Sequence, residues 1–237
     1  MQKLTAFSFI LLVLTSFVNA QESSTTTFKI YYNFSKTVFN TTFDLENQNY
    51  SAVEYELNSL SLGELSVAVN VRNNAGWAHE VELMPLSFHK TDFQHTQIER
   101  SIASAELSSE TFNVWKSRMR YQLNYYLADG NKIDFYLGLS SALNYQLFAK
   151  NPRNSYEFRN RLTKAGLVIG ITPGIEFPIS EKLNITVDGT YGILGLNLNR
   201  QNTNNPSLSM ADRKQNNFSV DFGRQGYQLR VGVGYTD

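Results

Sequence analysis

The sequence of 237 residues predicts an all-β fold, an eight-stranded antiparallel up-and-down transmembrane β-barrel. Three observations support this prediction. Apolar and polar residues alternate over long stretches, short turns and long polar segments alternate between these stretches, and beyond the N-terminal region no apolar run reaches the ~18 residues of a membrane helix. A strand with one apolar face needs a covering for that face, and we expect the covering to be lipid.

The clearest alternation runs from Trp115 to Leu127. The odd-numbered positions are mostly apolar, whereas the even-numbered positions include Lys116, Arg118 and Arg120. Side chains of a strand point to opposite faces at period two, so one face of this stretch is apolar and the other is polar and basic. A helical period of 3.6 would spread both kinds of residue around the whole helix.

The same alternation predicts eight strands in all. The third strand changes phase after Pro85, which indicates a β-bulge, because proline cannot donate to the ladder. The second strand keeps a single phase, with a weak middle at residues 58–63, and the eighth changes phase around residues 223–226. The expected strands are Phe28–Phe34, Val53–Val71, Trp77–Lys90, Trp115–Leu127, Ile133–Leu147, Lys164–Phe177, Leu183–Ile193 and Phe218–Tyr235.

Short and long connections alternate strictly along the chain. The short turns are 73–76, 129–132 and 180–182, and the long polar segments are 35–52, 91–111, 150–163 and 199–217. Strict alternation places all long segments at one end of a barrel and both termini at the other. This layout is typical of transmembrane barrels, which have short periplasmic turns and longer extracellular loops.

The N-terminal region predicts export. Residues 1–20 combine Lys3, an apolar run and the small residues Val18-Asn19-Ala20, which is the pattern of a secretory signal peptide. The expected domains are therefore a signal peptide at 1–20 and a barrel domain at 21–237. The chain contains no cysteine, so disulfides and thiolate metal sites are excluded, and a formal net charge of zero argues against a nucleic-acid partner.

On these strands and turns, the chain resembles the small eight-stranded outer-membrane barrels of Gram-negative bacteria, the OmpA/OmpX type. The resemblance is one of pattern over the whole barrel domain. It implies a cell-envelope location in the outer membrane with periplasmic termini. One departure is the ending Tyr235-Thr236-Asp237, because that family usually ends on an aromatic residue used in assembly.

A soluble lipocalin-like barrel with the apolar face inward and a small apolar ligand is the alternative. The length of the alternation and the aromatic residues near the ends of the apolar faces favour lipid outside. We expect an interfacial aromatic girdle formed by Trp77, Trp115, Tyr145, Phe177, Tyr227 and Tyr235.

The polar face is then the barrel interior, with six acidic and six basic residues. Buried charges need partners, and an eight-stranded barrel is just wide enough for its side chains, so we expect an ion-pair network that plugs the interior. We also expect the room beside Gly166, Gly170 and Gly174 to be filled by the arginines of the fourth strand. The network residues are Lys29, Glu64, Glu80, Glu82, Lys116, Arg118, Arg120, Asp134, Lys164, Glu176, Asp188 and Arg230.

No residue pattern indicates catalysis, a cofactor or a metal. The three histidines lack the spacing of zinc ligands, and a Ser87, His89 and Glu110 set fits chance in a chain rich in serine and acids. Residues 96–107 fit a short helix or, preferably, a solvated loop element. We expect a monomeric, non-enzymatic envelope protein that contacts outer-membrane lipid and, through its long loops, extracellular proteins or glycans. A narrow channel for small solutes or ions is the alternative.

Overall fold

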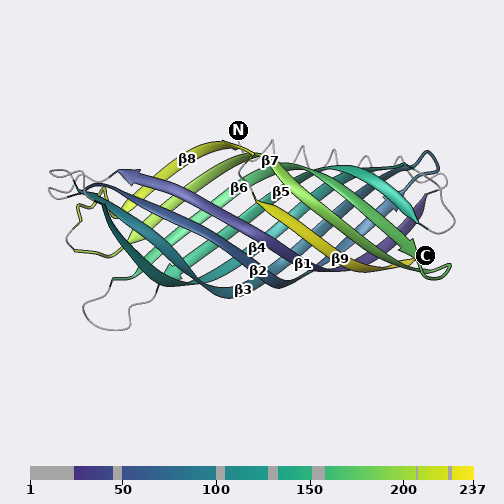
Figure 1. Cartoon of the computed structure of the whole chain (residues 1–237), viewed down its shortest axis with the longest axis horizontal. Coiled ribbons are helices and arrows are strands. Elements are labelled where there is room, and N and C mark those ends of the chain that lie inside the picture. Colours follow the sequence, from purple (N-terminus) through teal and green to yellow (C-terminus); the bar gives the residue numbers. More distant parts are fainter. Residues whose placement is uncertain are drawn as a thin grey trace.

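The structure, a computed structural model, describes residues 24–44, 50–99, 105–127, 133–150, 158–206, 208–223 and 226–237. Figure 1 shows long strands running obliquely around one axis. The strands in the described residues are β1 (Thr25–Asp44), β2 (Tyr50–Arg72), β3 (Trp77–Glu99), β4 (Ala105–Tyr126), β5 (Asp134–Lys150), β6 (Asn160–Pro178), β7 (Leu183–Thr203), β8 (Lys214–Phe222) and β9 (Tyr227–Thr236).

All pairings between these strands are antiparallel, and each strand from β1 to β7 pairs with the next one along the chain. β7 pairs with β8 over its second half and with β9 over its first half. β9 also pairs with β1, which closes the ring. β8 and β9 are thus two segments of one barrel strand, and the fold is a closed eight-stranded barrel.

The two segments meet where the sequence changes phase. Gly223 and Gly226 have φ values of 66° and 84°. These left-handed conformations suit glycine, which has no Cβ, and they let the chain change direction between β8 and β9.

The strands continue further than the sequence predicts. β1 runs through residues 35–44 and β3 through residues 91–99, both of which were expected to be loop. The helix or loop element expected at residues 96–107 is wrong, because Thr96–Ile98 pair with Leu107–Ala105 as strand. The polar residues of this segment have a weak preference for strand. They form strand because β3 and β4 pair here, and this tertiary pairing outweighs the local preference. The expected signal peptide and the 129–132 turn lie outside the described residues.

A bulge changes the phase of β2. Gly63 has a φ of 82°, and the pairing with β1 shifts by one residue between Asn33 and Phe34. The single phase expected for 53–71 is therefore wrong, because one extra residue at Gly63 gives the side chains before it the opposite faces to those expected. Glu54 and Glu56 are accordingly exposed, whereas Glu64 is buried. The bulge expected beside Pro85 is present, between Met84 and Ser87 in the pairing with β4.

The barrel is polar inside and apolar outside. Glu80, Glu82 and Arg120 are buried, whereas Leu83, Leu139 and Val233 are each about half exposed. The exposed apolar side chains belong to all strands and point away from the axis. No helix in the described residues is long and apolar enough to cross a membrane.

Candidate functional site: the barrel interior

The interior is crossed by a layer of buried charges. Four cations, Lys29, Arg118, Arg120 and Arg230, lie among four carboxylates, and the strands that supply these residues are spread around the whole ring. Each strand alternates at period two, so its inward positions project into the same narrow lumen. The carboxylates are Glu80, Glu82, Glu176 and Asp188.

Arg230 lies at the centre of this layer. Its Nε and Nη2 donate to Asp188 at 2.7 and 2.5 Å, and Asp188 pairs with it across β9 and β7. Its Nη1 reaches Glu80 at 2.9 Å and Glu82 at 2.8 Å, both on β3. The guanidinium is fully buried and also lies 4.0 Å from the ring centroid of Tyr31. One side chain of β9 thereby joins β7 to β3 through the lumen.

Two arginines of β4 complete the ion pairs of Glu82. Arg118 Nη2 lies 3.0 Å from Glu82 Oε1, and Arg120 Nη2 lies 2.8 Å from Glu82 Oε2. Arg120 Nη1 donates to the hydroxyl of Thr190 on β7 at 2.9 Å. Charge-assisted hydrogen bonds of this kind are stronger than neutral ones, so they hold β4 against both β3 and β7.

Lys29 connects β1 to β6. Its ammonium lies 2.9 Å from Glu176 Oε2 and 3.6 Å from Glu80 Oε2. Three tyrosines donate to the same carboxylates: Tyr31 to Glu80 at 3.0 Å, Tyr126 to Glu176 at 3.1 Å and Tyr136 to Asp188 at 2.6 Å. The hydroxyls donate to carboxylate lone pairs that have no cation as partner. A buried carboxylate needs these additional hydrogen bonds because it has lost its contact with water.

The remaining expected network residues lie nearer the two ends. Lys116 Nζ pairs with Glu64 Oε1 at 3.4 Å towards the long-connection end, where Lys164 has Asp221 as its acidic neighbour. Asp134 pairs with Arg72 Nη1 at 2.7 Å towards the short turns. The structure thus places all twelve predicted charges inside the barrel. Ten of them form ion pairs with one another, and an eleventh, Asp134, pairs with Arg72 instead.

Sequence reasoning missed several members of this network. Arg72 and the three tyrosines all occupy inward positions of their strands, and that phase is the signal that would have found them. The expectation that arginines fill the room beside the β6 glycines is wrong. The ring of Tyr136 lies over Gly174, and the amide of Asn197 lies against Gly166.

The described residues contain no group of three or more histidine, cysteine or acidic side chains able to hold a metal ion. The hydroxyl of Ser87 donates to Glu64 at 3.4 Å, and the side chain of Glu110 lies outside the described residues. The four cations and four carboxylates of the ion-pair layer neutralise one another's charge.

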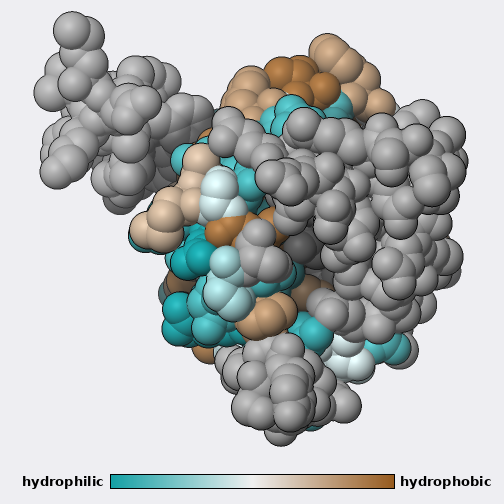
Figure 2. Space-filling model, turned by 90° about the vertical axis from the view of Figure 1, so that its left-hand side faces the viewer, coloured by the Kyte–Doolittle hydropathy of each residue, from teal (hydrophilic) through white to brown (hydrophobic). Residues whose placement is uncertain are grey.

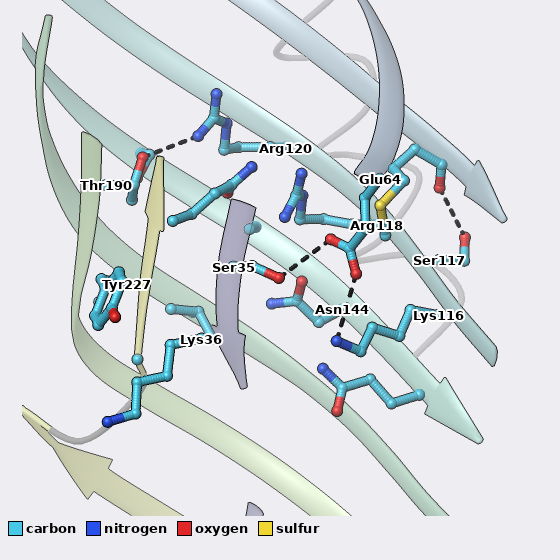
Figure 3. A pocket seen from close by; sticks show the side chains of 18 of the residues that line it. Ser35, Lys36, Glu64, Lys116, Ser117, Arg118, Arg120, Asn144, Thr190 and Tyr227 are labelled. Atoms are coloured by element: carbon cyan, nitrogen blue, oxygen red, sulfur yellow. Dashed lines mark hydrogen bonds and ion pairs between the residues drawn. The ribbon is translucent and has the colours of Figure 1, made fainter. Parts of the chain in front are cut away.

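Cavities lie on both sides of this layer. The cavity towards the short turns has a volume of about 470 Å³ and is lined by Arg72, Asp134 and Glu176 among others. The other, towards the long connections, has about 100 Å³ and is shown in Figure 3. In that view Ser35 and Lys116 both reach Glu64, and Arg120 reaches Thr190.

The predicted girdle residues lie on the outer surface. Trp77, Phe177 and Tyr235 lie beside the short turns, and Tyr227 lies eight residues away from Tyr235 on β9, or about 20 Å along the barrel axis for a tilted strand. Trp115 contacts Phe88, with ring centroids 5.3 Å apart, and pairs with Leu147 beside Tyr145. The distance of about 20 Å between Tyr227 and Tyr235 along the barrel axis is close to the ~25 Å height of the apolar band of transmembrane barrels.

Comparison with known proteins adds a fold assignment. No family model matches the sequence, and no curated protein matches it. The structure is similar to that of the outer membrane protein OprG from Pseudomonas aeruginosa, with a TM-score of 0.52 and 12% identity over 91% of this chain and 97% of that one. It is also similar to a major outer membrane protein from Thermus thermophilus, with a TM-score of 0.52 and 10% identity over 91% and 100% of the two chains. Similarity at this level of identity concerns the fold, and the chain therefore has the fold of the small eight-stranded outer-membrane barrels.

Proposed function

We propose that this chain is a non-enzymatic outer-membrane protein whose lumen is closed by the interior ion-pair layer and whose outer end makes the functional contacts. The observation that carries the proposal is the position of Arg230. Its guanidinium bonds to carboxylates of β3 and β7 at 2.9 Å or less, so its contacts cross the lumen.

The charge balance of the layer supports a structural role. Unpaired charges in a pore attract ions and water, whereas paired charges are held by their partners. Arg120, Arg230, Glu80 and Asp188 are all about 2% exposed or less, and each has a partner of opposite charge. A solute would have to separate these pairs in order to pass.

The distribution of apolar residues supports a membrane location rather than a soluble barrel. The outward faces of β5 and β9 carry leucine, valine and aromatic side chains, many of them about half exposed. A lipocalin-like protein keeps its apolar residues inside for its ligand, and this interior is charged. The fold is shared with outer-membrane proteins of two bacteria, which supports a location in the outer membrane. We propose that the short turns and both termini lie in the periplasm.

The outer end is the proposed contact surface for extracellular proteins or glycans. β1 to β4 all continue in this direction, to or from residues 44, 50, 99 and 105. Their exposed side chains in the described part include Glu54, Glu56 and Asp92, so the surface is polar. We propose a monomer, because the barrel closes within one chain.

Two measurements test this function. The chain is expressed with residues 1–20 in a Gram-negative host, and the outer membrane is analysed on SDS gels with and without boiling. Recovery there with a boiling-dependent mobility shift is expected. The purified barrel is then reconstituted in a planar lipid bilayer, where the wild type is expected to give no unitary conductance steps.

An engineered variant provides the positive comparison for the conductance measurement. Arg120→Ser shortens a side chain that joins β4 to Thr190, and Lys90→Ser is the matched control on the outer surface. Steps in Arg120→Ser but not in Lys90→Ser support a closed lumen. Steady steps in the wild type contradict it and favour the narrow channel.

A further inference from the structure

The barrel wall has a seam between β8 and the second half of β1, residues 36–44. β1 pairs with β9 from Thr27 to Ser35, and no backbone pairing joins residues 36–44 to β8, although every residue of both segments is described. β8 pairs with β7 alone. Two strand edges that share no backbone ladder therefore face each other at this seam.

Side chains bridge the seam in place of a ladder. The amide of Asn217 donates to the carbonyl oxygen of Thr42 at 3.0 Å, and the amide of Gln215 donates to that of Asp44. A direct ladder holds strands ~4.8 Å apart, and an interposed side chain requires a wider separation. The seam is thus joined by side chains in place of backbone hydrogen bonds.

The break between β8 and β9 sets the lower end of the seam. Gly226 packs so closely on the carbonyl group of Lys36 that a Cβ at this position would overlap it. Below this contact the β1–β9 ladder is continuous, and above it β1 and β8 separate.

The smaller interior cavity reaches this seam. Its lining includes Ser35 and Lys36 of β1 and Gly226–Gln228 at the break, together with inward residues of β4 and β6. Figure 3 shows Lys36 and Tyr227 on one side of the cavity and Lys116 and Arg118 on the other. The cavity therefore extends from the lumen to the barrel wall at the lower end of the seam.

The cavity lining is positively charged. It contains Lys36, Lys116, Arg118, Arg120 and Lys164 against the single carboxylate of Glu64. Glu82 and Glu80 of the ion-pair layer pair with the two arginines. The three lysines then face Glu64 and Asp221, the acidic neighbour of Lys164, so the lining keeps an excess of one positive charge. Arg118 Nε is buried and has no hydrogen-bond partner in the described residues. An anionic group is the complement of this lining.

The outer face beside the seam is apolar. Phe218, Val220 and Phe222 of β8 are 63%, 47% and 72% exposed. They pair with Leu198, Leu196 and Leu194 of β7, which extends the apolar surface across two strands. Figure 2 looks onto the end with the long connections and shows apolar atoms gathered at the top, on the side where β7 and β8 lie in Figure 1.

We propose that the seam binds an anionic amphiphile, with its carboxylate or phosphate group in the cavity and its acyl chain along β8. The volume of about 100 Å³ holds roughly three water molecules, which suits a head group and excludes a long chain. Lys36 lies at the entrance, and Phe222 marks the path of the chain. The proposal requires a barrel embedded in lipid but not a closed lumen, so the conductance measurement does not decide it.

Photolabelling tests the proposal. A palmitate analogue with a diazirine near the end of its chain is added to the barrel in phosphatidylcholine nanodiscs, and labelled peptides are identified by mass spectrometry. Because the natural chain has no cysteine, Thr42→Cys and Asn216→Cys, both exposed, can be joined across the seam by a short cross-linker that reductant removes. The matched control joins Ile30→Cys to Val233→Cys, which pair in the continuous ladder.

The expected result is labelling concentrated on β8 and residues 36–44. The 42–216 cross-link should reduce it several-fold, reductant should restore it, and the 30–233 cross-link should leave it unchanged. Dodecyl phosphate should compete, whereas dodecanol should not, and inorganic phosphate competing as well would identify a free anion and overturn the amphiphile. Lys36→Gln should weaken competition by dodecyl phosphate about threefold. Uniform labelling around the barrel, or equal effects of both cross-links, would overturn the proposal.

Discussion

The ring of Tyr136 lies over Gly174, the residue that pairs with it across β5 and β6. A Cβ on residue 174 would overlap the ring, and the hydroxyl beyond that ring donates to Asp188 at 2.6 Å. Tyr31 lies over its partner Gly232 in the same way. Glycines on the inner wall thus make room for tyrosines that support the ion-pair layer.

The first prediction concerns this packing. Gly174→Ala should destabilise the barrel by about 1–3 kcal/mol, because the added methyl group displaces the Tyr136 ring from its position. Urea unfolding of the protein in phospholipid vesicles, followed by circular dichroism, measures the change. The control is Gly189→Ala, whose Cβ would have its nearest neighbour at 3.9 Å. Equal stabilities of the two variants would show that the ring moves freely.

A second prediction concerns Arg230. Arg230→Met should cost about 3–5 kcal/mol, because Glu80, Glu82 and Asp188 then share too few cations in a buried layer. The fraction of heat-shifted, folded protein on unboiled gels and the urea midpoint both report this loss. Lys90→Met, which removes a cation from an exposed position, should leave both unchanged. An Arg230→Met protein as stable as the wild type would argue against the central role of this residue.

Hydrogen exchange should distinguish the two segments of the eighth barrel strand. β9 has paired neighbours on both sides, whereas β8 has one. Amides of Lys214–Phe222 should therefore exchange faster than those of Tyr227–Thr236, by more than about tenfold, when the protein in detergent is followed by mass spectrometry. Similar protection of both segments would mean that the seam is paired in solution.

The depth of the aromatic girdle can be measured with single tryptophans. With Trp77 and Trp115 replaced by phenylalanine, Val231→Trp should be quenched most by lipids brominated near the chain ends. Tyr227→Trp and Tyr235→Trp, four residues away on either side, should be quenched most by bromines near the head groups. A lack of quenching at all three positions would favour a soluble barrel.

The strand number and the inward charges could be predicted because both depend on period two. Once the phase of a strand such as Trp115–Leu127 is known, each of its residues is assigned to a face. Arg118 and Arg120 are thereby assigned to the inner face. Partners such as Glu82 cannot be paired with them from sequence, because the stagger of eight strands decides which side chains meet in the lumen.

The errors occur where a single residue changes the pattern. One bulged glycine, Gly63, gives the preceding part of β2 the opposite faces to those expected, and nothing in the local composition distinguishes it from a bend. Strand ends were placed too early because residues such as Thr96 and Gln97 are polar on both faces. Their conformation depends on the neighbouring strand rather than on their own preference.

The break at Gly223–Gly226 has a consequence for how this architecture can vary. In the described residues, nine backbone pairs join the first barrel strand to the last, from Thr27–Thr236 to Ser35–Gln228, and all of them belong to β9. The β1–β9 ladder therefore closes the barrel without a pairing to β8. We therefore expect that the half of the molecule with the long connections can gain or lose residues, and change its chemistry, without opening the half that the β1–β9 ladder closes.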